Sequence, residues 1–416
     1  MARELVNDFL VVSRYSEPPA QATVTQAFSA AGLGAPTYEA ATPEPSSAGA
    51  APPASQRLGV YRLVATPTGA TLRLSVTRHD SAALAGMGEG AFTQLTRRVS
   101  AEDAQTLRTG VLTFDMRVKS EEQRAPEALR WALEALRALV SMTGGAVVDP
   151  AAQTAWGVTQ LASMLTGSPT TQLSVHDEAW GADSRWLHTH GLQKFGRPEL
   201  DLAAIPVALR NEAEAFLLEV AERLALGERL VAGQEIDLDD LGVVVAVTVA
   251  PDGEHLAPYT RLRLADAPAP GERQSVGVGR LLTRMALADA QRRRAAGDAA
   301  GALEIIERAL SADSDDCAAL FLKAGILLDS RRPHEAMELG ELMELRTPMD
   351  YRGPLTVGLA LLTIGRSREA LNAFDRAIER EPESAQAFAA RAEAYRLLGD
   401  ERLAAVDRAR AAYLGV

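Results

Sequence analysis

The pattern of apolar and polar residues changes its period along the chain. Apolar residues alternate with polar ones in residues 71–77 and 112–118, which is typical of strands with one buried face. Residues 126–143 instead carry an apolar stripe at helical spacing, which begins at Pro126 and ends before Gly144 and Gly145. Both periods are present before residue 270, so this region combines strands with helices.

Residues 1–270 are therefore predicted to be an α+β region, with an antiparallel or mixed sheet and packed helices, as one domain or as two subdomains at 1–150 and 151–270. Residues 34–56 are rich in Pro, Ala, Ser and Gly and are expected to be flexible. The expected strands are 8–15, 58–65, 71–77, 112–118, 146–148, 171–176, 185–190, 241–250 and 259–264. The expected helices are 20–33, 126–143 and a helix that carries Leu209, Ala213, Phe216, Val220 and Leu224, with Gly227 as its cap.

After residue 283 the sequence repeats every 34 residues. Turn positions recur at Gly297, Arg331, Gly365 and Gly399. Small or flexible residues recur at Ala302, Ala336, Ala370 and Ala404, and again at Ala309, Met343, Ala377 and Ala411. Pro348 and Pro382 follow the second helix of the middle units, where proline disfavours further helix.

These residues resemble the tetratricopeptide repeat (TPR) family, whose units are helical hairpins of 34 residues. The resemblance places four units at 283–316, 317–350, 351–384 and 385–416, after a linker or helix start at 271–282. It implies an all-α solenoid, in which the first helix of each unit lines a concave face. On that face the partner-binding candidates are Phe321, Leu328, Leu355, Leu359 and Leu362. A partner protein or peptide is expected to fill this apolar groove, or else the protein's own N-terminal domain does so.

Composition narrows the function classes. The formal charge of −12 argues against a binder of nucleic acid or of anionic membranes, because such proteins carry a surplus of cations. No stretch of 18 apolar residues and no leader-like N-terminus is present, so we expect a cytoplasmic protein. Abundant Ala and Arg, with only three lysines, suggest a GC-rich bacterial source. The single Cys317 excludes an internal disulfide, and no standard nucleotide loop occurs, so no cofactor is predicted.

Candidate chemistry is concentrated in one stretch, Trp186 to Leu200, within residues 125–250, which resemble an uncharacterised bacterial domain of unknown function. His188 and His190 are two apart and would face the same side of a strand. They are the metal and catalytic candidates, and Glu199 is a further catalytic candidate. His176, Asp177, Glu178 or Glu199 would complete the metal site. The alternative is a structural histidine pair near a strand end.

Lys194 and Arg197 form a second candidate, an anion site in the turn between residues 191 and 199. They would equally serve the fold by pairing with Glu199 and Asp201. The favoured hypothesis is a cytoplasmic bacterial interaction scaffold rather than an enzyme. The alternative is an enzyme, such as a metal-dependent hydrolase, with its site near His188, His190 and Arg197 and with the array recruiting the substrate.

Overall fold

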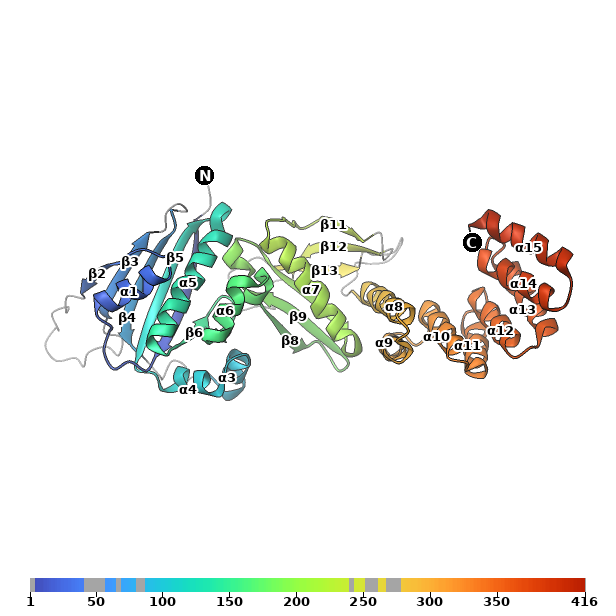
Figure 1. The fold of residues 1–416 in the computed structure, drawn as a ribbon, viewed down its shortest axis with the longest axis horizontal. Coiled ribbons are helices and arrows are strands. Elements are labelled where there is room, and N and C mark those ends of the chain that lie inside the picture. Colours follow the sequence, from blue (N-terminus) through green and yellow to red (C-terminus); the bar gives the residue numbers. More distant parts are fainter. Residues whose placement is uncertain are drawn as a thin grey trace.

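The computed structural model describes residues 4–40, 57–64, 69–79, 87–238, 243–250, 261–266 and 278–415. Figure 1 shows an elongated molecule with three parts in a row: a first sheet with its helices, a second sheet with its helix, and a curved array of paired helices. The predicted α+β region followed by a tetratricopeptide-type array is therefore confirmed.

The first sheet has seven described strands in the order β2-β3-β4-β5-β1-β6-β7, and its neighbours pair antiparallel. Its central pair, β1 and β5, joins the N-terminal strand to one that begins about a hundred residues later. The strands are β1 (Glu4–Ser13), β2 (Thr37–Ala40), β3 (Arg57–Val64), β4 (Thr71–Arg78), β5 (Leu112–Glu121), β6 (Ala146–Asp149) and β7 (Thr154–Trp156).

Helices cover both faces of the first sheet. On one face α1 (Gln21–Ala30) packs against α5 (Ala125–Thr143), whose apolar stripe lies in the main core. On the other face α3 (Glu89–Thr96) and α4 (Ala101–Thr109) bury a smaller cluster that includes Val12 and Leu107. Neither α3 nor α4 was predicted from the sequence.

The second sheet has six described strands in the order β11-β12-β13-β10-β9-β8. Only the β10 and β13 pair is parallel among these strands. One face packs on α7 (Arg210–Ala225), and the other carries polar side chains from β8, β9, β10 and β13. The strands are β8 (Ser174–Ala179), β9 (Ser184–His190), β10 (Glu199–Pro206), β11 (Glu235–Leu238), β12 (Val243–Val249) and β13 (Arg261–Asp266).

Short helices connect these parts. η1 (Glu122–Arg124) precedes α5, while α6 (Val158–Thr166) and η2 (Pro169–Gln172) lead from the first sheet to β8. η3 (Leu192–Phe195) joins β9 to β10, and η4 (Val207–Leu209) leads into α7. The first sheet continues beyond residue 150, since β7 belongs to it. In the expected flexible segment, residues 37–40 form β2, and residues 41–56 lie outside the described residues.

Four helical hairpins form the array in residues 278–415. The turn residues Gly297, Gly365 and Gly399 have φ of 82°, 82° and 84°, and Arg331 has φ of 58°, so all four predicted turn positions adopt the left-handed conformation. The helices are α8 (Gly279–Ala295), α9 (Ala299–Ala312), α10 (Cys317–Asp329), α11 (Pro333–Arg346), α12 (Arg352–Thr363), α13 (Ser367–Arg380), α14 (Ala385–Leu397) and α15 (Glu401–Leu414).

The first hairpin packs directly on the second sheet domain. α9 lies against η4, and α8 contacts α7, β10, β12 and β13. Asp266 at the end of β13 accepts hydrogen bonds from the backbone N–H groups of Arg280 and Leu281, and so caps the start of α8. Of the expected linker at 271–282, residues 271–277 lie outside the described residues, Val278 precedes α8, and residues 279–282 begin it.

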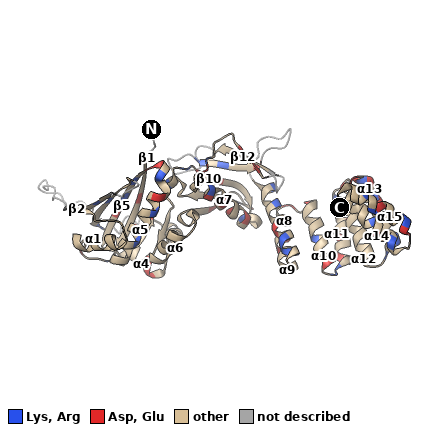
Figure 2. Ribbon diagram, turned by 45° about the horizontal axis from the view of Figure 1, so that its top comes forward, with Lys and Arg blue, Asp and Glu red and all other residues tan. Residues whose placement is uncertain are grey.

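Charged residues of both signs are interspersed along the helices of the array (Figure 2). None of the helices in the described ranges combines the length with the apolar composition that crossing a membrane requires.

Candidate functional site

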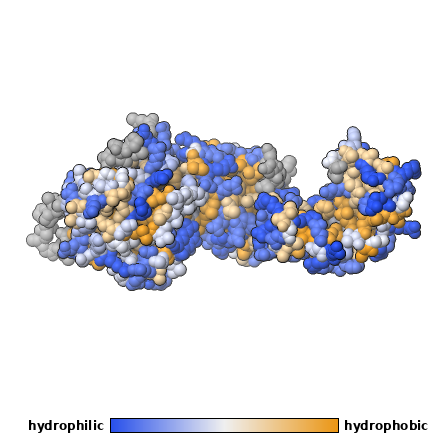
Figure 3. Space-filling model, viewed as in Figure 1, coloured by the Kyte–Doolittle hydropathy of each residue, from blue (hydrophilic) through white to orange (hydrophobic). Residues whose placement is uncertain are grey.

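The concave side of the array forms a groove of ≈ 960 Å³. Its walls come from α8, α10, α12 and α14, the first helix of each hairpin. Every described residue that lines it lies between Arg284 and Ala390, so the described part of the N-terminal region does not enter it. Figure 3 shows hydrophobic residues gathered over the array around α12 and α14.

The five partner-binding candidates from the sequence all line this groove. Phe321, Leu328, Leu359 and Leu362 are partly buried and keep some surface on the groove. Leu355 differs, because it is only 1% exposed and packs in the cluster that contains Phe374. Leu355 therefore supports the floor of the groove, and the other four side chains form its accessible apolar surface.

Arginines border the apolar floor. Arg294 forms a 2.6 Å ion pair with Asp329, and Arg352 forms one of 2.6 Å with Asp350. Arg284 is exposed at the α8 end and forms no ion pair with any residue that the structure describes. The groove thus combines an apolar floor with positive charge, of which Arg284 is the most available part.

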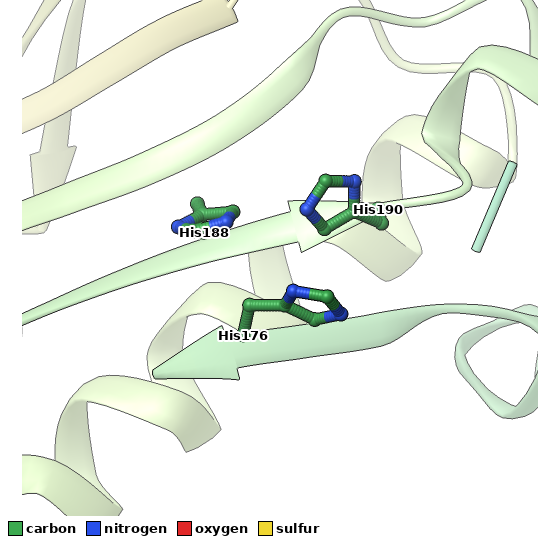
Figure 4. Close-up of side chains that lie close together, drawn as sticks. All are labelled: His176, His188 and His190. Carbon is green, nitrogen blue, oxygen red and sulfur yellow. The ribbon is translucent and has the colours of Figure 1, made fainter. Parts of the chain in front are cut away.

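A second candidate site lies on the polar face of the second sheet. His176 on β8 and His188 on β9 are directly paired across the two strands, and His190 follows His188 on the same face. The three rings face one another in Figure 4, and their centroids are 4.3–5.5 Å apart. One ring nitrogen from each histidine lies within 4.8 Å of one from each of the others.

Burial and charge keep His176 neutral at pH 7. Burial lowers the pKa of His176 to about 4, and the nearby cations Arg97 and Arg261 contribute to the lowering. Its Nε2 atom is buried and has no hydrogen-bond partner among the described residues. A neutral imidazole with an available nitrogen is the form that binds metal ions.

The carboxylates considered for this site occupy different places. Glu178 lies next to the cluster, with Oε1 3.9 Å from His188 Nε2. Asp177 points elsewhere and pairs with Arg185 and Arg210.

Glu199, the third catalytic candidate, is buried at the start of β10 and holds the η3 turn. Its carboxylate accepts hydrogen bonds from Thr189 Oγ1 and from the N–H groups of Gly191 and Gln193. Burial raises the pKa of Glu199 to about 7, against the effect of these hydrogen bonds.

The two cations of the anion-site candidate do not converge. Lys194 is buried and pairs with Asp149 on β6, and Arg197 pairs with Glu122 on η1 at 2.9 Å. Both partners belong to the first sheet domain, and neither is Glu199 or Asp201, the pairing considered from the sequence. These residues join the two sheet domains, and Asp201 pairs instead with Arg263.

The arginines on the polar face were not anticipated from the sequence. The parallel pairing of β10 and β13 places Asp201 beside Arg263, with hydrogen bonds of 2.9 and 3.0 Å, and Glu199 beside Arg261 in register. The sequence did contain a signal for this pairing. Two carboxylates lie two residues apart on one strand, Glu199 and Asp201, and two arginines lie two residues apart on another, Arg261 and Arg263.

Neither the known protein-family models nor the curated proteins match the chain. Among solved structures, the chain is similar to TTC0263, a thermophilic TPR protein from Thermus thermophilus, at 25% identity and a TM-score of 0.31, over 32% of this chain and 74% of that chain. It is also similar to MamA from Desulfovibrio magneticus, at 18% identity and a TM-score of 0.27, over 32% and 75% of the two chains.

Proposed function

We propose that the protein is an interaction scaffold that binds a segment of a partner protein in the groove of its helical array. The observation that carries the proposal is the apolar surface of Phe321, Leu328, Leu359 and Leu362, which runs across two neighbouring hairpins and is left partly exposed. Burying a large apolar side chain is worth roughly 1.5–3 kcal/mol, so a partner that covers these residues gains affinity from each. Contiguous apolar surfaces bordered by polar residues are typical of interaction sites.

The occupant is a separate protein rather than the described part of the N-terminal region. That region contacts the array at its first hairpin, through η4, α7 and the second sheet, and contributes no described residue to the groove. The apolar groove residues belong to the second and third hairpins, which lie further along the array than that contact.

The chemistry of the groove defines the kind of segment that fits. A partner segment that carries large apolar side chains at helical spacing would pack against the row formed by Phe321, Leu359 and Leu362. Acidic residues in the same partner segment would complement the charge of Arg284, whose guanidinium has no carboxylate partner among the described residues. We therefore expect an amphipathic segment with an apolar face and flanking carboxylates.

Site-directed photo-crosslinking tests the proposal. A photoreactive residue at position 359 should capture specific partners from the native host. The same residue at position 345 should not, because Leu345 is 78% exposed on α11 and lies outside the groove. Each partner is then purified and titrated against the full chain by calorimetry.

Matched variants decide the outcome. Leu359→Glu should weaken a captured partner roughly tenfold or more, because it places a charge at the centre of the interface. Leu345→Glu should leave the affinity unchanged, and both should melt close to the wild type. Arg284→Glu should weaken binding more at low salt than at high salt. The proposal fails if Leu359→Glu folds and keeps full affinity for every partner.

A further inference from the structure

We propose that His176, His188 and His190 bind a single zinc ion on the polar face of the second sheet, independently of the array groove. The three side chains come from two neighbouring strands, and one ring nitrogen of each lies within 4.8 Å of one from each of the others. Three imidazoles are a recurrent protein ligand set for zinc, with a fourth position left for water or another ligand.

The strand register explains why three histidines converge. His176 is the cross-strand partner of His188, so their Cβ atoms are neighbours on one face of the sheet. His190 lies two residues further along β9 and returns to the same face. Two strands thus supply a triangle of imidazoles from a rigid part of the fold, which favours a fixed coordination geometry.

The ring separations match the proposed ion. With Zn–N bonds of about 2.0–2.1 Å in a tetrahedral arrangement, the centroids of the bound rings lie roughly 5 Å apart. The observed separations are 4.3, 5.0 and 5.5 Å. Binding therefore requires the rings to turn their nitrogens inward, and it requires little displacement of the strands.

Neighbouring side chains hold the cluster in place. The Trp186 ring lies 4.0 Å from the His188 ring, and its Nε1 donates to Asp201 Oδ2 at 3.3 Å. Asp201 is itself fixed by two hydrogen bonds from Arg263. Such outer residues orient the ligands of metal sites and are needed for full affinity.

Glu178 is a carboxylate beside the three histidines. Its Oε1 atom lies 3.9 Å from His188 Nε2, and its side chain is 56% exposed, so it is reachable from solvent. Its negative charge offsets the nearby Arg97 and Arg261, which oppose the binding of a cation. Nitrogen ligands with an adjacent carboxylate favour Zn²⁺ over Mg²⁺ or Ca²⁺, which prefer all-oxygen sites.

Equilibrium dialysis against zinc tests the proposal on the full chain without a histidine tag, after removal of metal with a chelator. We expect one zinc per chain in the wild type. We also expect a loss of affinity of roughly 100-fold or more in His176→Ala and His190→Ala, because each removes a ligand. His334→Ala is the matched control, since His334 is exposed on α11 and far along the chain from the cluster. It should retain one zinc per chain.

If a histidine variant fails to fold, X-ray absorption at the zinc edge of the zinc-loaded wild type identifies the zinc ligands instead. Three imidazole ligands and no sulfur would support the site. Fewer than two imidazoles, or a sulfur ligand from Cys317, would overturn it. A wild-type zinc content far below one per chain, or full retention of zinc in His176→Ala and His190→Ala, would also overturn it.

Discussion

Lys194 Nζ donates a hydrogen bond to Asp149 Oδ2 at a distance of 2.5 Å, and the two side chains are only 1% and 0% exposed. Lys194 belongs to η3, which follows β9 of the second sheet, and Asp149 ends β6 of the first. The Lys194 ammonium also donates to Gln172 O at 2.6 Å and lies 5.1 Å from the centre of the Trp156 ring. This buried ion pair therefore ties the two sheet domains together at a point that water does not reach.

Lys194→Met should destabilise the protein by about 3–5 kcal/mol, because it leaves the Asp149 carboxylate buried without its counter-ion. Chemical denaturation measures the free energy of unfolding. The control is Lys119→Met, because Lys119 pairs with Glu4 at 2.8 Å where both side chains are about half exposed or more. An exposed pair is worth about 0–1 kcal/mol. Equal costs for the two variants would contradict the structural role assigned to Lys194.

Arg331→Gly should stabilise the array by about 0.5–1 kcal/mol. Arg331 has φ of 58° in a turn where the other three units have glycine, and a side chain is strained in that conformation. Gly365→Ala should have the opposite effect, a loss of about 1 kcal/mol, although a Cβ atom at Gly365 would meet nothing within 4 Å. Thermal unfolding measures both, and a loss of stability in Arg331→Gly would show that the side chain has a role that outweighs the strain.

The array could be predicted in detail because its signal is local and repeated. Ala302, Ala336, Ala370 and Ala404 are all fully buried where the helices of each hairpin meet, as their spacing of 34 residues indicated. The 34-residue period does not predict that Leu355 is buried while Leu359 stays partly exposed. Both lie on the concave side of α12, and only the packing of Leu355 in the cluster with Phe374 removes it from solvent.

The histidine cluster was predictable in part. The spacing of His188 and His190 placed them on one face, but only the register of β8 against β9 selects His176 as the third member among four candidates. Lys194 and Arg197 pair with residues that lie 45 and 75 positions earlier in the sequence. These partners belong to the other sheet domain, so no local pattern predicts them. Pairing between distant strands is decided by the whole fold.

The half-buried His176 and the buried Glu199 should give opposite dependences of stability on pH. The folded pKa of His176 is about 4 against 6.5 when unfolded, so the unfolded chain binds more protons between these values and stability rises with pH. The folded pKa of Glu199 is about 7 against 4.5 when unfolded, so the folded chain binds more protons and stability falls as pH rises through that range. The two effects have opposite signs, so they oppose each other between about pH 4.5 and 6.5 in the wild type.

Single variants separate the two contributions in urea titrations from about pH 4.5 to 7 with a chelator present. In Glu199→Gln the histidine remains, so the free energy of unfolding should increase with pH. In His176→Asn the carboxyl remains, so it should decrease with pH. If both variants show the same slope as the wild type, neither group governs the pH dependence.

Cutting the chain between residues 267 and 277 should not separate the array from the N-terminal region. Leu281, Leu282, Ile305 and Ile306 of the first hairpin belong to the same buried cluster as Leu209 of η4. Each large apolar side chain contributes roughly 1.5–3 kcal/mol when buried, which is enough in sum to hold two fragments together. Arg308 on α9 also pairs with Glu212 on α7 at 2.8 Å.

The test inserts a specific protease site after residue 270 and follows the cleaved protein by gel filtration. The two fragments should elute together in buffer and separate only in denaturant. Ile306→Asp should release them after cleavage, because it buries an unpaired charge in the cluster that α9 shares with Leu209 of η4, where Ile306 is 0% exposed. The control is Leu345→Asp, an exposed leucine on α11, which should leave the fragments associated. If the unmodified fragments separate on cleavage alone, the first hairpin belongs to an independent array, and the contact with η4 does not hold the two parts of the molecule together.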